Sequence, residues 1–217
     1  MNESLSWRQV PGWFDFDDVY REAVDRAPSG GAHFVEVGVM CGRSALFMAN
    51  AIRASGKKIV FDAVDPWAPT LDDFKRIAEN LPWAAENFPW AKMVEKVCDS
   101  TKLLDVLRVS ASPESPDVVS RVVDLLGLGD FVRLVRAKGQ EQAFQYPAES
   151  LDFVYVDALH TYEDTQQILQ AFVPKLRGGG VLAGHDYKTT YPGVDQAVSD
   201  VLGTKIETRR QSFVWTK

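Results

Sequence analysis

The chain has 217 residues, of which 46% are hydrophobic and 25% are charged, and its formal net charge is −6. This length and composition fit a single domain with a full hydrophobic core. The acidic balance argues against long nucleic acid as a partner, because no basic block is available to neutralise phosphates.

The number of cysteines and the lack of long apolar runs bear on the cellular compartment in which the chain is expected. The two cysteines, Cys41 and Cys98, are too few and too far apart for a disulfide framework or a zinc site, which suits a reducing cytoplasm. The polar N-terminus has no signal-peptide pattern, and no apolar run approaches the ~20 residues that span a bilayer. We therefore expect a cytoplasmic protein without a membrane partner.

The first third of the chain predicts a strand, a glycine turn, a helix and a second strand. Apolar residues at helical spacing predict a helix over 15–27, and the Pro-Ser-Gly-Gly sequence at 28–31 ends it. A strand follows at 33–37, then a helix at 43–55 and a strand at 59–64. Such a unit favours parallel strands with a right-handed crossover.

The segment 66–127 has a different composition, rich in aromatic residues and proline. We expect irregular helical pieces, with a regular helix near 116–126, inserted into a single domain of residues 1–217 as a lid or substrate cap. The aromatic residues of this insertion are Trp67, Phe74, Trp83, Phe88 and Trp90. The alternatives are a satellite core or an oligomer contact, the latter compatible with a homodimer.

The last part of the chain returns to strands and helices in alternation. Strands are predicted at 131–135, 151–156 and 181–183, with helices at 163–176 and 194–202. Two short runs at 205–208 and 212–215 predict an antiparallel hairpin. The fold class is therefore α/β, a Rossmann-like doubly wound sheet of seven strands that is mostly parallel.

The loop after the first strand carries a glycine pattern that suggests a ligand. Gly38 permits a tight turn and the close approach of a ligand, and Gly42 lets the following helix start near the strand. The loop is not the dinucleotide G-x-G-x-x-G and lacks the P-loop lysine, so a ligand without phosphates fits better. Asp65, at the end of the second strand, could accept hydrogen bonds from ribose hydroxyls, and Glu36 could meet a cationic group. The alternative is a tight turn without a ligand, with Asp65 as a helix cap.

Two polar clusters follow the strands predicted at 151–156 and 181–183. Asp157 and His160 follow the first strand, and His185 and Asp186 follow the second. Ligands bind at the carboxyl ends of strands in an open α/β sheet. Two carboxylates and two imidazoles there predict a metal site or an acid–base site. The alternatives are that His160 caps a helix or packs on Tyr162, and that Asp186 pairs with Lys188.

A series of motifs in this order resembles a known family. The motifs are Glu-x-Gly-x-x-x-Gly-Arg-Ser, Val-Asp-Pro-Trp, Val-Asp-Ala-x-His-x-Tyr-Glu, Pro-Lys-Leu-x-x-Gly-Gly-x-x-x-Gly-His-Asp-Tyr and Pro-Gly-Val-x-x-Ala-Val. Over residues 30–203 the chain resembles class I S-adenosylmethionine-dependent methyltransferases, in the branch of macrocin-type sugar O-methyltransferases and cephalosporin-hydroxylase-like proteins. The resemblance implies S-adenosylmethionine bound by Glu36, Gly38, Gly42, Ser44, Asp65, Trp67, Gln140 and Asp157.

The resemblance also implies methyl transfer to a hydroxyl of a small molecule, such as a sugar or a natural product. A hydroxyl needs a base or a metal ion to help remove its proton. We expect His160 to be the base, with His185 as the second candidate, and Asp157, His185 and Asp186 to hold Mg²⁺ or Mn²⁺. Relatives often have a further acid where this chain has Leu159 and His185, and an imidazole ligand also admits transition ions.

Two other functions remain open from the sequence. One is a non-catalytic module that binds the cofactor or a sugar within a biosynthetic cluster, although a pure binder has no need for a poised base. The other is a nicotinamide-dependent oxidoreductase. The glycine loop lacks the second glycine of the dinucleotide pattern, and the chain ends in an antiparallel hairpin, and both features argue against this function.

Overall fold

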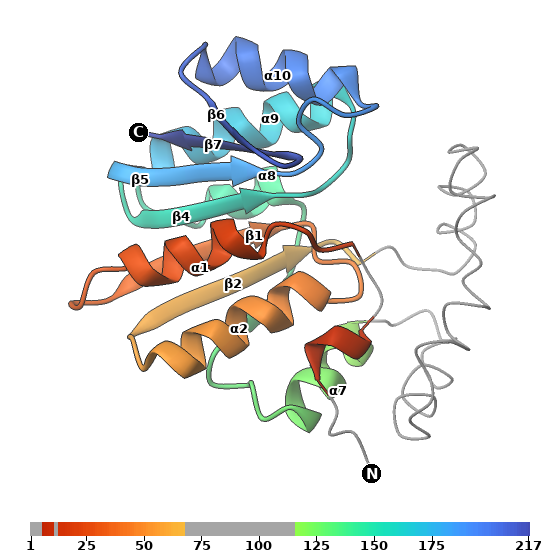
Figure 1. Ribbon diagram of the computed structural model, residues 1–217, viewed down its shortest axis with the longest axis vertical. Coiled ribbons are helices and arrows are strands. Elements are labelled where there is room, and N and C mark those ends of the chain that lie inside the picture. Colours follow the sequence, from red (N-terminus) through yellow and green to blue (C-terminus); the bar gives the residue numbers. More distant parts are fainter. Residues whose placement is uncertain (1–5, 11–12, 68–115) are drawn as a thin grey trace, which may run out of the picture.

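The computed structural model describes residues 6–10, 13–67 and 116–217. Seven strands form one sheet in the order β3-β2-β1-β4-β5-β7-β6 (Figure 1). The strands are β1 (Ala32–Val37), β2 (Ile59–Asp65), β3 (Arg133–Arg136), β4 (Leu151–Val156), β5 (Leu176–Gly184), β6 (Glu207–Arg209) and β7 (Ser212–Thr216). Neighbours from β3 to β5 are parallel, whereas β7 is antiparallel to both β5 and β6. The predicted fold class and the C-terminal hairpin are confirmed.

Helices cover both faces of this sheet (Figure 1). On one face lie α1 (Asp17–Arg26), α2 (Arg43–Ser55) and α7 (Pro116–Leu125), and on the other lie α8 (Gly139–Ala143), α9 (Tyr162–Phe172) and α10 (Pro192–Leu202). Two apolar cores result, one under each helical layer. The strand order reverses at β1, which lies between β2 and β4, and such a switch point is where open α/β sheets bind ligands.

Some boundaries differ from the sequence-based expectation. The helix predicted at 43–55 and the strand predicted at 151–156 agree with α2 and β4, but the helix predicted over 163–176 is too long. It ends at Phe172, a 3₁₀ turn Val173–Lys175 follows, and Leu176 already pairs with Leu151 in the sheet. The strand predicted at 181–183 is too short, because β5 already begins at Leu176 and includes the glycines at 178–180. The five-residue helix α8 was not predicted, because it is too short to show a period.

The described ends of the segment 66–127 pack on the main body. Trp67 is 5% exposed, and Val119 and Val122 of α7 are buried in the same core as α2. Phe74, Trp83, Phe88 and Trp90 lie outside the described residues, so the lid or cap stays a prediction. Among the residues that the structure describes, no helix is long and apolar enough to cross a membrane.

Candidate functional site

The loops after β1, β4 and β5 meet at one edge of the sheet. The backbone N–H of Asp157 donates to the carbonyl of Val37 at 2.8 Å, and that of His185 donates to the carbonyl of Val156 at 3.0 Å. These hydrogen bonds extend the strand pairing by one residue beyond β4 and β5. The two polar clusters predicted from the sequence therefore lie beside each other and beside the glycine loop.

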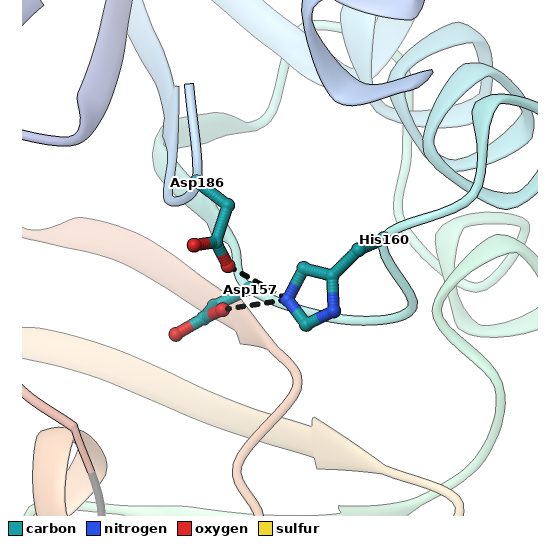
Figure 2. A group of neighbouring side chains, drawn as sticks. All are labelled: Asp157, His160 and Asp186. Carbon is teal, nitrogen blue, oxygen red and sulfur yellow. Dashed lines mark ion pairs between the residues drawn. The ribbon is translucent and has the colours of Figure 1, made fainter. Parts of the chain in front are cut away.

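Asp157, His160 and Asp186 converge at this edge (Figure 2). Nε2 of His160 lies 2.7 Å from Oδ2 of Asp186 and 3.8 Å from Oδ1 of Asp157. Each residue offers one ligand atom, and these atoms lie within 4.8 Å of one another. This spacing suits either a divalent cation or a proton-transfer site.

His185 lies near the same two carboxylate oxygens. Its Nδ1 is 3.4 Å from Oδ2 of Asp186 and 3.9 Å from Oδ1 of Asp157. Its Nε2 is 2.9 Å from Oδ1 of Asp15, a residue that the sequence analysis missed. Asp15 lies 170 positions away in the chain, and it has no motif of its own that could have signalled this contact.

The carboxylates control the charge of both imidazoles. Burial opposes a positive charge on these rings, but hydrogen bonds and attraction from Asp157 and Asp186 outweigh it and raise the pKa of His160 to about 9. The pKa of His185 is likewise raised to about 9 by Asp186, Asp157 and Asp15, again against the effect of burial. Burial would raise the pKa of Asp186, yet its two imidazole partners hold that pKa well below the ordinary range. The site therefore strongly favours bound positive charge.

The structure does not show the purely structural roles considered for His160 and Asp186. The ring of His160 stacks on Tyr191 at 4.4 Å between centroids, and the cap of α9 is Thr161. The backbone N–H of Lys188 donates to Asp195, and its Nζ donates to Thr208. His160 is thus neither the cap nor packed on Tyr162, and the ion-pair partners of Asp186 are the two histidines.

Asp65 holds the glycine loop in shape. One carboxylate oxygen accepts hydrogen bonds from the N–H groups of Val39 at 2.7 Å and Met40 at 2.9 Å. The other oxygen accepts one from the N–H of Trp67 at 2.6 Å, and the Trp67 indole donates to the carbonyl of Met40 at 3.2 Å. A carboxylate offers about four acceptor positions, so about one remains for a ligand hydroxyl. The predicted ribose contact thus shares Asp65 with a structural role.

The glycines of this loop are needed for close packing. A Cβ on Gly38 would lie 1.8 Å from the carbonyl oxygen of Asp157, and the residue has φ +93°. A Cβ on Gly42 would lie 2.8 Å from Val119, and this residue, with φ +91°, precedes α2. The close approach at Gly38 is therefore made by the backbone of the β4–α9 loop.

Glu36 and Ser44 are buried against each other. Glu36 is 1% exposed, and the Ser44 hydroxyl donates to its Oε1 at 2.5 Å, joining β1 to α2. Burial, partly offset by this hydrogen bond, raises the pKa of Glu36 to about 8. Near neutral pH the carboxyl is therefore mostly uncharged. The contact of Glu36 and Ser44 with a cofactor stays a prediction, as does that of Gln140, which lies half-buried in α8 after β3.

Glu36→Gln is expected to change how stability depends on pH. The folded chain keeps a proton on Glu36 up to about pH 8, whereas the unfolded chain releases it near the ordinary value of 4.5. Stability therefore falls by about 1.4 kcal/mol per pH unit between these values, and the neutral amide removes this loss. We expect the variant to gain about 1–3 kcal/mol over the original chain between pH 5 and pH 7, measured by urea unfolding. A difference between the two chains that is the same at both pH values would contradict the raised pKa.

A partly open hollow of about 230 Å³ lies away from these residues, at the amino ends of β4 and β5. Asp152, Arg177, Arg209 and Glu22 are among the residues that line it. Arg177 pairs with Asp152, and Arg209 pairs with Glu22. Because its charges are already matched, this hollow is a weaker candidate site than the carboxyl edge of the sheet.

Comparisons with known proteins show the family and the fold. A family model described as a methyltransferase domain matches residues 35–187. The solved structure of the O-methyltransferase NovP is 19% identical, with 93% of this chain and 79% of that chain covered and a TM-score of 0.60. CalS11, described as a calicheamicin methyltransferase, is 17% identical, with 93% and 77% covered and a TM-score of 0.59.

A third solved structure has the same fold. A protein of Thermotoga maritima, described as a SAM-dependent O-methyltransferase, is 11% identical, with 96% of this chain and 66% of that chain covered and a TM-score of 0.55. At such identities these likenesses concern the fold. No curated protein sequence matches the chain.

Proposed function

The chain belongs to the methyltransferase-domain family, and we propose that it is an S-adenosylmethionine-dependent O-methyltransferase that acts on a hydroxyl group of a small molecule. The observation that carries this proposal is the convergence of Asp157, His160 and Asp186 beside the glycine loop, at the switch point of the sheet. Transfer to oxygen needs a group that takes up the hydroxyl proton, and this cluster provides one. Two of the solved structures with this fold are described as O-methyltransferases, which supports oxygen as the acceptor atom.

The residues near the glycine loop fit the cofactor. We propose that the remaining acceptor position of Asp65 binds a ribose hydroxyl and that Gln140 contacts the adenine. Glu36, Gly38, Gly42, Ser44, Trp67 and Asp157 complete the proposed set. When bound, S-adenosylmethionine supplies the reactive methyl group, and the chain contributes binding and orientation.

We propose the neutral form of the His160 imidazole as the group that removes the acceptor proton. Because the pKa of His160 is about 9, this form becomes more abundant as the pH rises above neutrality. Asp186, 2.7 Å from Nε2 of His160, orients the ring and stabilises the imidazolium that forms. The neighbouring carboxylate of Asp157 adds to this stabilisation. His185 is the second candidate for the base.

Asp157, His160 and Asp186, the donors that the structure brings together, also fit a divalent cation, Mg²⁺ or Mn²⁺. We propose that the carboxylates of Asp157 and Asp186 hold it together with Nδ1 of His185, which leaves His160 as the base. A bound cation would help ionise the acceptor hydroxyl. Metal ligands must be deprotonated, so a cation and the protons of these imidazoles compete for the same carboxylates.

Binding and turnover measurements test the proposed function together. We expect calorimetry to show binding of S-adenosylhomocysteine and none of NAD, because the loop lacks a phosphate-binding pattern. Incubation with S-adenosylmethionine and a panel of sugars, macrolides and phenols is expected to release S-adenosylhomocysteine. Cofactor binding without turnover on any hydroxyl would favour the non-catalytic module, and binding of NAD alone would favour the oxidoreductase.

Chelation in the same assay tests the proposed cation independently of the proposed methyl transfer. We expect EDTA to stop turnover without weakening the binding of S-adenosylhomocysteine, and Mg²⁺ or Mn²⁺ to restore it. Turnover that is unchanged after EDTA treatment would contradict the cation and leave the methyltransferase proposal standing.

A further inference from the structure

Asp15 joins the N-terminal segment to the proposed catalytic site. Its Oδ1 lies 2.9 Å from Nε2 of His185, which can donate a hydrogen bond to it. The contact links the residues just before α1 to the loop after β5. Neither the glycine loop nor the two polar clusters of the sequence includes it.

The ring of His185 has little freedom to turn. Its side chain is 9% exposed, and the ring lies 5.1 Å from that of Phe16 between centroids. Phe16 in turn stacks on Tyr155 of β4 at 4.3 Å. The backbone N–H of His185 is bonded to Val156. The ring therefore presents one nitrogen to Asp15 and the other to the carboxylates.

Asp15 is itself held in place. A guanidinium nitrogen of Arg210, in the turn between β6 and β7, donates to the backbone carbonyl of Asp15. The side chain of Asp15 is 42% exposed, so solvent also reaches it. The carboxylate is thus fixed at its backbone and bonded to the imidazole at its tip.

We propose that Asp15 is a positioning residue, which keeps the proton on Nε2 of His185 and turns Nδ1 toward Asp157 and Asp186. This inference rests on the proposed function, because it makes Nδ1 the nitrogen ligand of the proposed cation. A carboxylate that accepts the second N–H of a ligating histidine fixes the tautomer and the orientation of the ring. Nδ1 lies 3.4 Å from Oδ2 of Asp186 and 3.9 Å from Oδ1 of Asp157, so it faces the two carboxylates that would hold the cation.

Nuclear magnetic resonance of the imidazole nitrogens tests the hydrogen bond directly. The chain has three histidines, so His185 can be assigned by its loss in His185→Gln. We expect a hydrogen-bonded Nε2–H signal in the original chain, its loss in Asp15→Ala and its partial retention in Asp15→Asn, which keeps an acceptor oxygen. Asp17→Ala is the matched control, because this acid contacts Arg21 and Arg210 instead. The same Nε2–H signal in Asp15→Ala as in the original chain would overturn the proposal.

Titration with Mn²⁺, followed by electron paramagnetic resonance, tests the consequence for the cation. We expect Asp15→Ala to weaken Mn²⁺ binding about 10-fold or more, Asp15→Asn to weaken it less, and Asp17→Ala to leave it unchanged. Equal affinity in Asp15→Ala and the original chain, or no Mn²⁺ binding by the original chain, would overturn the ligand role of Nδ1. Binding of S-adenosylhomocysteine, measured in the same samples, is expected to be unchanged. Its absence in the original chain would instead be a failure of the proposed function.

Discussion

His160→Ala is expected to lower methyl transfer by a factor of about 10² to 10⁴ while S-adenosylhomocysteine still binds. The imidazole is the group that we propose takes the acceptor proton, and alanine leaves none in its place. The ring lies at the tip of β4, 33% exposed, so its removal opens no cavity in either core. The measurement is the initial rate of S-adenosylhomocysteine release with the best acceptor of the panel.

A second histidine provides the control for this variant. His33 lies at the amino end of β1, where its Nε2 is 2.8 Å from Asp62. We expect His33→Gln to keep most of the turnover, because the glutamine amide can still form a hydrogen bond with Asp62. Residue 33 also lies at the amino end of β1, whereas the proposed site lies at the carboxyl ends of the strands. His160→Ala with the turnover of the original chain would disprove the assignment of the base. Equal losses in both variants would point to a general effect on folding.

The sequence predicted the residues at the strand ends well, for a topological reason. Asp157 and His185 each directly follow a buried apolar run, and parallel strands bring their carboxyl ends to one edge. If the two apolar runs form neighbouring parallel strands, the side chains that follow them must lie close together. The strand order itself could only be inferred from the fold class.

The contacts between distant segments could not be predicted in this way. Asp15 meets His185 because α1 packs across the sheet face that carries Tyr155, and nothing near residue 15 encodes that packing angle. Similarly, the sequence placed Asp65 at the end of β2 but gave no sign that the N–H groups of Val39, Met40 and Trp67 bind its carboxylate. The periodicity of apolar residues indicates which face of a helix or strand is buried. It does not indicate which side chains of other elements that face contacts.

Gly38→Ala is expected to destabilise the chain by about 3 kcal/mol or more, or to prevent folding. The added methyl group would lie 1.8 Å from the Asp157 carbonyl oxygen. The backbone of Asp157 cannot move aside without breaking the hydrogen bond from its N–H to the carbonyl of Val37. Gly38 also has φ +93°, a conformation that alanine adopts only with strain. Urea unfolding measures the loss, with Gly30→Ala as the control, since no atom lies within 4 Å of a Cβ there.

The same variant tests whether the glycine loop and the polar cluster form one site. Any Gly38→Ala protein that folds must push the β4–α9 loop outward, and Asp157 and His160 would move with it. We therefore expect such a protein to lose Mn²⁺ binding and methyl transfer together, because both need Asp157 beside Asp186. A Gly38→Ala chain as stable as Gly30→Ala would contradict the close approach of the two loops. The placement of the cofactor next to the acid–base cluster depends on that approach.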